Sequence, residues 1–210
     1  GPTGAGKSSI INLLGRFYEY QKGTVSIDGN LIRDIDLNSL RKHVGIVVQD
    51  VFLFSDTIYN NITLNNPRIT MEEVRTASKE IGADDFIMRL PGDYQYAVGE
   101  RGGTLSVGQR QLLAFIRAYL YNPEILILDE ATSSVDTESE EMIQKATEKI
   151  TENRTSIIIA HRLATIQKSD RIMVVDVGRI IESGNHTELL KENGFYKNLY
   201  DMQFATVLES

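Results

Sequence analysis

The first eight residues carry the most specific chemical pattern in the chain. They read GPTGAGKS and fit G-x-x-x-x-G-K-[ST] at every fixed position. The glycines of this pattern let backbone N–H groups close around phosphates at the N-terminus of a helix. Lys7 is then placed to bridge the β- and γ-phosphates of a nucleotide, and the Ser8 hydroxyl to ligate Mg²⁺. The alternative is a glycine-rich turn before an ordinary helix, which the motifs below disfavour.

A pair of carboxylates follows a short apolar run. Asp129 and Glu130 come directly after ILIL at residues 125–128. The run predicts a buried strand, and ligands of open α/β sheets bind beyond the carboxyl ends of the strands. At that place Asp129 is suited to bind Mg²⁺, and Glu130 is suited to act as a general base that polarises water. Such a pair is often only the start of a capped loop, but a phosphate loop in the same chain favours the catalytic interpretation.

The stretch TLSVGQ at residues 104–109 precedes a predicted amphipathic helix over residues 110–121. The apolar stripe of that helix consists of Leu112, Leu113, Ile116 and Leu120. Ser106 is a suitable N-cap for it. The exposed donors around this cap also suit a nucleotide phosphate, so both interpretations stay open at this point.

Strands and helices must position these motifs. Apolar runs of four or five residues separated by helical patterns are typical of a parallel sheet covered by helices on both faces. The predicted strands are residues 23–27, 44–48, 125–128, 156–159 and 172–175. The predicted helices are residues 8–14, 71–81, 84–89, 110–121, 138–150 and 163–167, with a polar helical tail over 187–202. We expect an α/β core of residues 1–49 and 121–210, and an inserted α-helical subdomain over residues 50–120.

Composition excludes several classes of protein. The 210 residues include 22 Lys and Arg against 29 Asp and Glu, and this net charge of -7 argues against a general nucleic-acid binder. Hydrophobic residues make up 41%, which is enough for a globular core. The absence of cysteine excludes disulfide scaffolds, thiolate metal sites and cysteine nucleophiles. The apolar runs are far shorter than the roughly 20 residues of a membrane span.

The order of the motifs resembles the nucleotide-binding domains of ATP-binding cassette (ABC) transporters. The resemblance covers essentially the whole chain and rests on the phosphate loop, Gln49 after a strand, LSVGQ at 105–109, ILILDE at 125–130, Ser134-Val135-Asp136, and His161. Two further stretches, FSDTI at 54–58 and VGERG at 98–102, resemble the exporter branch of multidrug transporters and lipid flippases. In that branch the domain follows a membrane domain on the same polypeptide.

The resemblance implies the fold and the activity. The fold would be a P-loop NTPase (RecA-like) α/β fold with a mostly parallel sheet, and its N-terminal strands would be missing because none precedes Gly1. The sequence would then be a piece of a longer protein, without the family's adenine-stacking residue. The activity would be Mg²⁺-dependent ATP hydrolysis that powers export, at the cytoplasmic face of a membrane. Two such domains would face each other head to tail, with no nucleic acid as a partner.

The resemblance also implies a role for each motif residue. Lys7 would belong to an ATP-binding set formed by Gly1, Pro2, Thr3, Gly4, Ala5, Gly6, Lys7, Ser8 and Ser9. Mg²⁺ would be held by Ser8, Gln49 and Asp129, with Gln49 also touching the attacking water. Catalysis would involve Glu130, Gln49 and His161, the last holding the γ-phosphate. The partner's ATP would be covered by Ser106, Gly108 and Gln109, and Asp136 would signal across the dimer.

Two details sharpen these expectations. Val107 stands where the family has glycine, and its β-branched side chain restricts backbone approach to the partner's phosphate. This departure slightly favours a heterodimer over a homodimer. Phe52, Leu53 and Phe54 are apolar without strand alternation, and we expect part of this segment to line a groove for a short helix of the membrane domain. The alternative for the segment is core packing.

Three other functions compete with this interpretation. A DNA-repair or chromosome-maintenance ATPase shares the phosphate loop, signature and Asp-Glu pair, but it needs a coiled coil between Gln49 and Leu105, where no heptads occur. A soluble ABC protein of translation carries two cassettes in one chain and leaves the exporter-like stretches unexplained. A binding module without catalysis would lack Glu130 or His161, and both are present.

Overall fold

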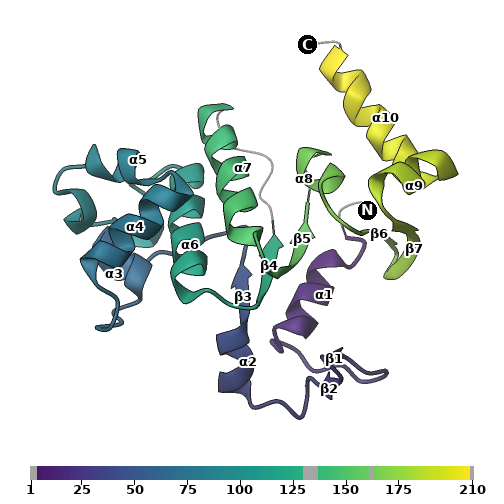
Figure 1. Cartoon of the computed structure of the whole chain (residues 1–210), viewed down its shortest axis with the longest axis horizontal. Helices are drawn as coiled ribbons and strands as arrows, with labels where there is room; N and C mark the ends of the chain where they lie inside the picture. The colour runs from purple at the N-terminus through teal and green to yellow at the C-terminus, as the bar shows by residue number, and fades with distance from the viewer. Residues whose placement is uncertain (1–3, 130–136, 161–162, 209–210) are drawn as a thin grey trace. The chain divides into compact units, whose positions relative to one another are not determined.

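A computed structural model describes residues 4–129, 137–160 and 163–208 of the chain (Figure 1). Contacts divide it into two compact units, one of Gly1–Asp34 with Ile159–Ser210 and the other of Ile35–Ile158. Each unit has its own helices, strands and apolar cluster. The division expected from the sequence, into a core and an inserted helical subdomain over residues 50–120, stays a prediction.

The larger unit is built on a sheet with the order β3 (Val44–Val47), β4 (Ile125–Asp129), β5 (Thr155–Ile159). β3 and β4 are parallel, with Val44 opposite Ile125. Residues 126–128 are buried, because the central strand of such a sheet is covered on both faces. Pro123 lies so close to β3 that a β-carbon on Gly45 would come within 2.5 Å of its Cγ atom. The predicted strands over 44–48, 125–128 and 156–159 are confirmed to within one residue at each end.

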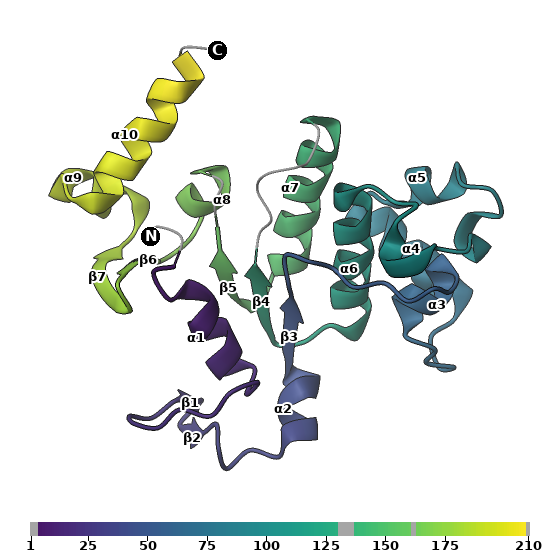
Figure 2. The same cartoon turned by 180° about the vertical axis from the view of Figure 1, so that it is seen from behind.

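α6 (Val107–Tyr121) is the helix on which several other helices of this unit pack. The other helices of the unit are α2 (Leu37–His43), α3 (Ile58–Thr63), α4 (Met71–Ile81), α5 (Asp84–Met88) and α7 (Thr137–Thr151). Short 3-10 helices follow at Asp93–Gln95 and Glu100–Gly102. α6 contacts α3 and α4 on one side and β3 and α7 on the other (Figures 1 and 2). Its predicted apolar stripe is buried at Leu112, Leu113 and Ile116, within a cluster that continues into β4.

The predicted helix over residues 71–81 is confirmed at both ends because its signals are local. Thr70 and Glu73 form a capping box, in which the Thr70 N–H donates to the Glu73 carboxylate over 2.7 Å. Gly82 ends the helix with φ 77, a left-handed conformation that glycine adopts without strain. The α2 helix was not predicted. Its start is marked only by Asp36, which accepts the Ser39 N–H over 2.9 Å.

The smaller unit contains α1 (Lys7–Leu14), α8 (Leu163–Gln167), α9 (His186–Glu192) and α10 (Phe195–Leu208). Its strands form two antiparallel pairs, β1 (Ser26–Ile27) with β2 (Asn30–Leu31) and β6 (Ile172–Asp176) with β7 (Arg179–Gly184). The strand expected over 23–27 covers only residues 26 and 27, and Asp28 (φ 48) and Gly29 (φ 79) then turn the chain into a tight hairpin with β2. The predicted helical tail is divided at Asn193, whose φ of 54 ends α9. Within the described ranges, every helix is too short or too polar to cross a bilayer.

Candidate nucleotide-binding site

The phosphate loop has the backbone that its glycines predict. Gly4 (φ 81) and Gly6 (φ 104) are left-handed, and Gly6 is the N-cap of α1, a cap residue without a side chain to bond the first-turn N–H groups. The first N–H groups of a helix lack partners within the helix, so a glycine cap suits a helix N-terminus that binds an anion. Among the residues that the structure describes, none lies within 4 Å of a β-carbon built on Gly4. Ser8 and Ser9 are exposed. Gly1, Pro2 and Thr3 lie outside the described residues.

The turn between β6 and β7 supports this loop. The Gly178 N–H donates to the Ala5 carbonyl over 2.8 Å, and Ala5 is buried. A β-carbon on Gly6 would lie 3.5 Å from the Gly178 Cα atom. In the sequence, residues 177–179 predict a turn into a last strand, which β7 confirms. No local pattern links them to the loop, so the contact became visible only in the fold.

Gln49 and Asp129 belong to the other unit, at one edge of its sheet. Asp129 is the last residue of β4 and half-buried, and Gln49 follows β3 and is exposed. Because β3 and β4 are parallel, their carboxyl ends meet at the same edge, which is where ligands of such sheets bind. Glu130, Asp136 and His161 lie outside the described residues. Their predicted roles are therefore not tested.

The signature residues form a helix cap. Ser106 is the N-cap of α6, where its Oγ atom accepts the Gln109 N–H over 3.1 Å and the Gln109 Oε1 atom accepts the Ser106 N–H over 3.0 Å. The predicted N-cap is confirmed, and Gln109 completes a capping box that the sequence analysis did not include. Gly108 is buried, and a β-carbon on it would lie 2.9 Å from the Ser139 Cβ atom of α7. Gly108 therefore also permits the close approach of α6 and α7.

The segment after Gln49 combines the two alternatives expected for it. Leu53 is fully buried in the apolar cluster of its unit. Phe52 and Phe54 are 56% and 55% exposed, and their rings meet edge to face with centroids 5.1 Å apart. Leu53 thus anchors the segment in the core, while the two phenylalanines form an aromatic pair on the surface.

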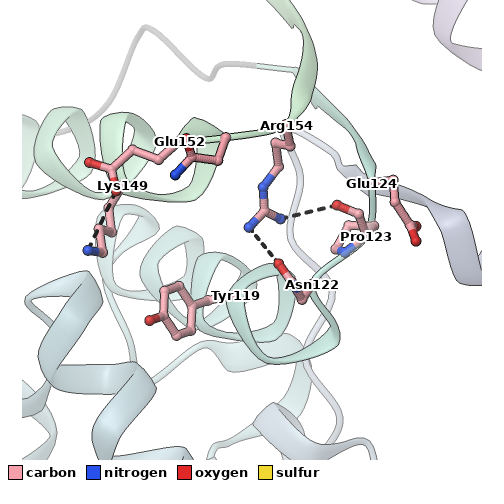
Figure 3. A pocket seen from close by; sticks show the side chains of 8 residues that line it. Tyr119, Asn122, Pro123, Glu124, Lys149, Glu152 and Arg154 are labelled. Atoms are coloured by element: carbon pink, nitrogen blue, oxygen red, sulfur yellow. Dashed lines mark hydrogen bonds and ion pairs between the residues drawn. The ribbon is translucent and has the colours of Figure 1, made fainter.

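A polar pocket of about 560 Å³ opens at the amino ends of β4 and β5, opposite the carboxyl ends where Gln49 and Asp129 lie (Figure 3). Its lining consists of Tyr119, Asn122, Pro123, Glu124, Lys149, Glu152, Asn153 and Arg154. Arg154 donates to the Asn122 Oδ1 atom over 2.8 Å and to the Pro123 carbonyl over 3.3 Å. These residues precede the strands, whereas Gln49 and Asp129 lie at or beyond the carboxyl ends. The pocket is therefore separate from the predicted nucleotide site.

Comparisons with known proteins agree with the motifs. A family model described as "ABC transporter" matches residues 1–133. The chain is 50% identical to the probable multidrug resistance ABC transporter ATP-binding/permease protein YheH of Bacillus subtilis, over 97% of this chain and 30% of that protein. It is 49% identical to the ATP-dependent lipid A-core flippase of Saccharophagus degradans, over 98% of this chain and 35% of that protein.

A solved structure of a bacterial Atm1-family ABC exporter with ATP bound matches with a TM-score of 0.89 and 45% identity. The match covers 97% of this chain and 36% of that chain, so the sequence spans about a third of the proteins it resembles. The expected P-loop NTPase fold, with a parallel sheet and helices, is confirmed. The helices between Gln49 and Leu105 are short, the longest being α4 with 11 residues, and this disfavours the coiled-coil alternative. The chain therefore belongs to the ABC transporter family, as one of its ATP-binding domains.

Proposed function

We propose that the chain hydrolyses Mg-ATP and that this hydrolysis powers export across a membrane. The observation that carries the proposal is the glycine-capped N-terminus of α1, which presents backbone N–H groups together with Lys7 and Ser8. Lys7 neutralises the phosphates, and the backbone donors orient them. Glu130 acts as the general base toward water, and His161 holds the γ-phosphate.

Magnesium fits the residues assigned to it. A serine hydroxyl, an amide oxygen and a carboxylate are hard oxygen ligands, which Mg²⁺ prefers together with substrate phosphates. Ser8, Gln49 and Asp129 supply this set, and Ser8 and Gln49 are exposed. When bound, the ion neutralises charge that develops on the transferred phosphoryl group.

The transmembrane part of the transporter would lie on the same polypeptide, upstream of Gly1. The support is that relatives with near 50% identity are about three times longer, and one is named an ATP-binding/permease protein. The domain would then work at the cytoplasmic face of the membrane. Phe52 and Phe54 would line the groove that receives a short apolar helix of the membrane part, because Leu53 fixes them on the surface.

The second ATP-binding domain would be a different chain. In a head-to-tail dimer, Ser106, Gly108 and Gln109 of this chain cover the partner's ATP, and Asp136 contacts the partner. Val107 is half-buried at the first position of α6, beside the cap. Its methyl groups hinder close approach of a phosphate, so the site that this signature covers would hydrolyse ATP weakly. Copurification with the product of the neighbouring gene tests this, and a homodimer active at both sites and unaffected by Val107→Gly would contradict it.

Replacement of the proposed base tests the hydrolytic function. Glu130→Gln keeps the shape of the side chain but removes its basicity, so ATP binding should persist while turnover falls about 10²- to 10⁴-fold. Glu72→Gln, at an exposed position of α4, is the matched control and should leave turnover unchanged. Steady-state phosphate release measures turnover, and equilibrium titration with ATP measures binding. Normal turnover by Glu130→Gln would show that Glu130 is not the general base.

A further inference from the structure

The exposed aromatic pair belongs to a loop that a buried asparagine closes. The Asn61 side chain is fully buried, and its Oδ1 atom accepts the Phe54 N–H over 2.8 Å. Its Nδ2 atom donates to the Phe54 carbonyl and to the Thr57 carbonyl, each over 3.0 Å. A side-chain amide that bonds both polar groups of one residue fixes the backbone of that residue. Phe54 is therefore held rigidly although its ring is exposed.

Arg117 ties this loop to the signature helix. Arg117 lies in the third turn of α6, and its Nε atom donates to the Asn61 carbonyl over 2.6 Å. Its Nη2 atom donates to the Asn61 Oδ1 atom over 3.3 Å, and its Nη1 atom donates to the Phe52 carbonyl over 3.2 Å. A planar guanidinium can serve several acceptors in fixed directions, which a lysine ammonium on its flexible stem cannot reproduce. One side chain of α6 thus holds both ends of the segment from Phe52 to Asn61.

A second attachment lies near the N-terminus of α6. Gly102 is buried with φ 75, and a β-carbon on it would lie 2.9 Å from the Leu53 Cδ1 atom and 2.7 Å from the Arg110 Cδ atom. Arg110 in turn donates to the Leu105 carbonyl over 2.7 Å. The loop before the signature therefore packs between Leu53 and α6, so the aromatic segment contacts α6 at two levels.

We propose that Arg117 is a positioning residue that makes the Phe52–Phe54 pair and the signature helix move as one body. A displacement of the aromatic pair is then transmitted along α6 to its cap at Ser106, and a displacement of the cap is transmitted back to the pair. The inference deepens the proposed function and rests on it, because the proposed function assigns the aromatic pair to contact with the membrane part. It adds a named residue through which that contact acts.

Arg154 is a matched control in the same unit. Like Arg117 it donates to an asparagine Oδ1 atom and to a backbone carbonyl, those of Asn122 and Pro123 (Figure 3). Both arginines are half-buried. Arg154, however, connects the segments that lead into β4 and β5, and neither of these two hydrogen bonds reaches the aromatic segment. Arg154→Lys should therefore cost stability through lost hydrogen bonds, as the Arg117 variants do, without affecting the proposed link between α6 and the aromatic pair.

The test compares Arg117→Lys, Arg117→Met and Arg154→Lys in the full-length protein in lipid nanodiscs, each with Glu130→Gln so that added Mg-ATP is not hydrolysed. Hydrogen exchange is measured with and without Mg-ATP. Without nucleotide, the amides of residues 52–57 should exchange at least tenfold faster in both Arg117 variants than in Arg154→Lys. With Mg-ATP, residues 4–10 should be protected in all proteins, while the response of residues 52–57 and of the membrane part should fall at least fivefold in the Arg117 variants alone.

Unchanged exchange of residues 52–57 in both Arg117 variants would overturn the proposal, as would an undiminished response of the membrane part. Arg117→Lys keeps the charge and volume, so it tests the link even where Arg117→Met does not fold. Absence of any response to Mg-ATP in the protein without an arginine change would overturn the proposed function instead. In that case the exchange without nucleotide would still decide whether Arg117 holds the segment.

Discussion

Two helix N-termini of this chain are predicted to face nucleotide phosphates, and they are built in opposite ways. The N-cap of α1 is Gly6, a left-handed glycine that has no side chain to bond the first-turn N–H groups. α6 begins at Ser106, where a complete capping box with Gln109 satisfies two backbone N–H groups. An uncapped N-terminus is less stable in itself and more available to an anion.

The difference indicates a division of labour. We predict that a ligand completes the N-terminus of α1 and that its loop holds ATP within this chain. α6 is complete without a ligand, so it can remain folded while no partner is present and contribute only its remaining donors when one arrives. We therefore expect the N-terminus of α1 to contribute most of the binding free energy for ATP, and the capping box of α6 to contribute to the free energy of folding.

The largest expected effect belongs to α1. Lys7→Ala removes a charged donor from the β- and γ-phosphates, and such hydrogen bonds are worth about 1.5–3 kcal/mol, or roughly 10- to 100-fold in the dissociation constant for ATP. The exposed Lys22 lies in the same unit, and Lys22→Ala is the control that should bind ATP normally. Equilibrium titration with a fluorescent ATP analogue measures both. If the two variants bound the ATP analogue with equal affinity, Lys7 and the N-terminus of α1 would not be the ATP-binding site.

An intermediate effect is expected at Gly108, on stability. Gly108→Ala places a methyl group 2.9 Å from the Ser139 Cβ atom, and overpacking of this kind costs about 1–3 kcal/mol. Alanine's better helix propensity offsets less than about 1 kcal/mol of that cost. Urea unfolding should show the loss, while ATP binding at α1 persists. Gly103→Ala, whose new methyl group would lie 3.3 Å from the Glu100 carbonyl oxygen, should be milder. Equal stabilities would contradict close packing of α6 on α7.

The smallest effect separates the cap from the phosphate contact. Ser106→Ala removes the N-cap acceptor and should cost about 1 kcal/mol of stability, without change in ATP binding by this chain. Ser106→Asp keeps a good cap but adds a negative charge, so it should restore stability and weaken only the site shared with the partner. Thermal unfolding and ATP hydrolysis by the assembled pair measure the two properties. A stability loss in Ser106→Asp as large as that in Ser106→Ala would argue against the capping role.

Local signals explain what could be predicted from the sequence. Thr70, Glu73 and Gly82 lie within or next to the helix they delimit, and the run ILIL marks a buried strand by itself. The phosphate loop is recognisable because its glycines, lysine and serine are adjacent in the chain. The fold class and the family follow from several such patterns in a fixed order.

Long-range contacts could not be predicted in this way. The bond from Gly178 to Ala5 and the bonds from Arg117 to Asn61 join segments that are far apart in the sequence. Neither pair has a local pattern, since each residue is ordinary for its own turn or helix. The role of Gly108 in packing was likewise hidden, because its motif pointed only to phosphate contact.

Amide hydrogen exchange at the two N-termini tests the central claim most directly. The chain is kept at a concentration where light scattering shows a monomer, and Mg-ATP is added in excess. This claim predicts strong protection of the amides of residues 4–10 and no change at residues 106–109. Protection of residues 106–109 in the monomer, or unchanged exchange at residues 4–10, would contradict it.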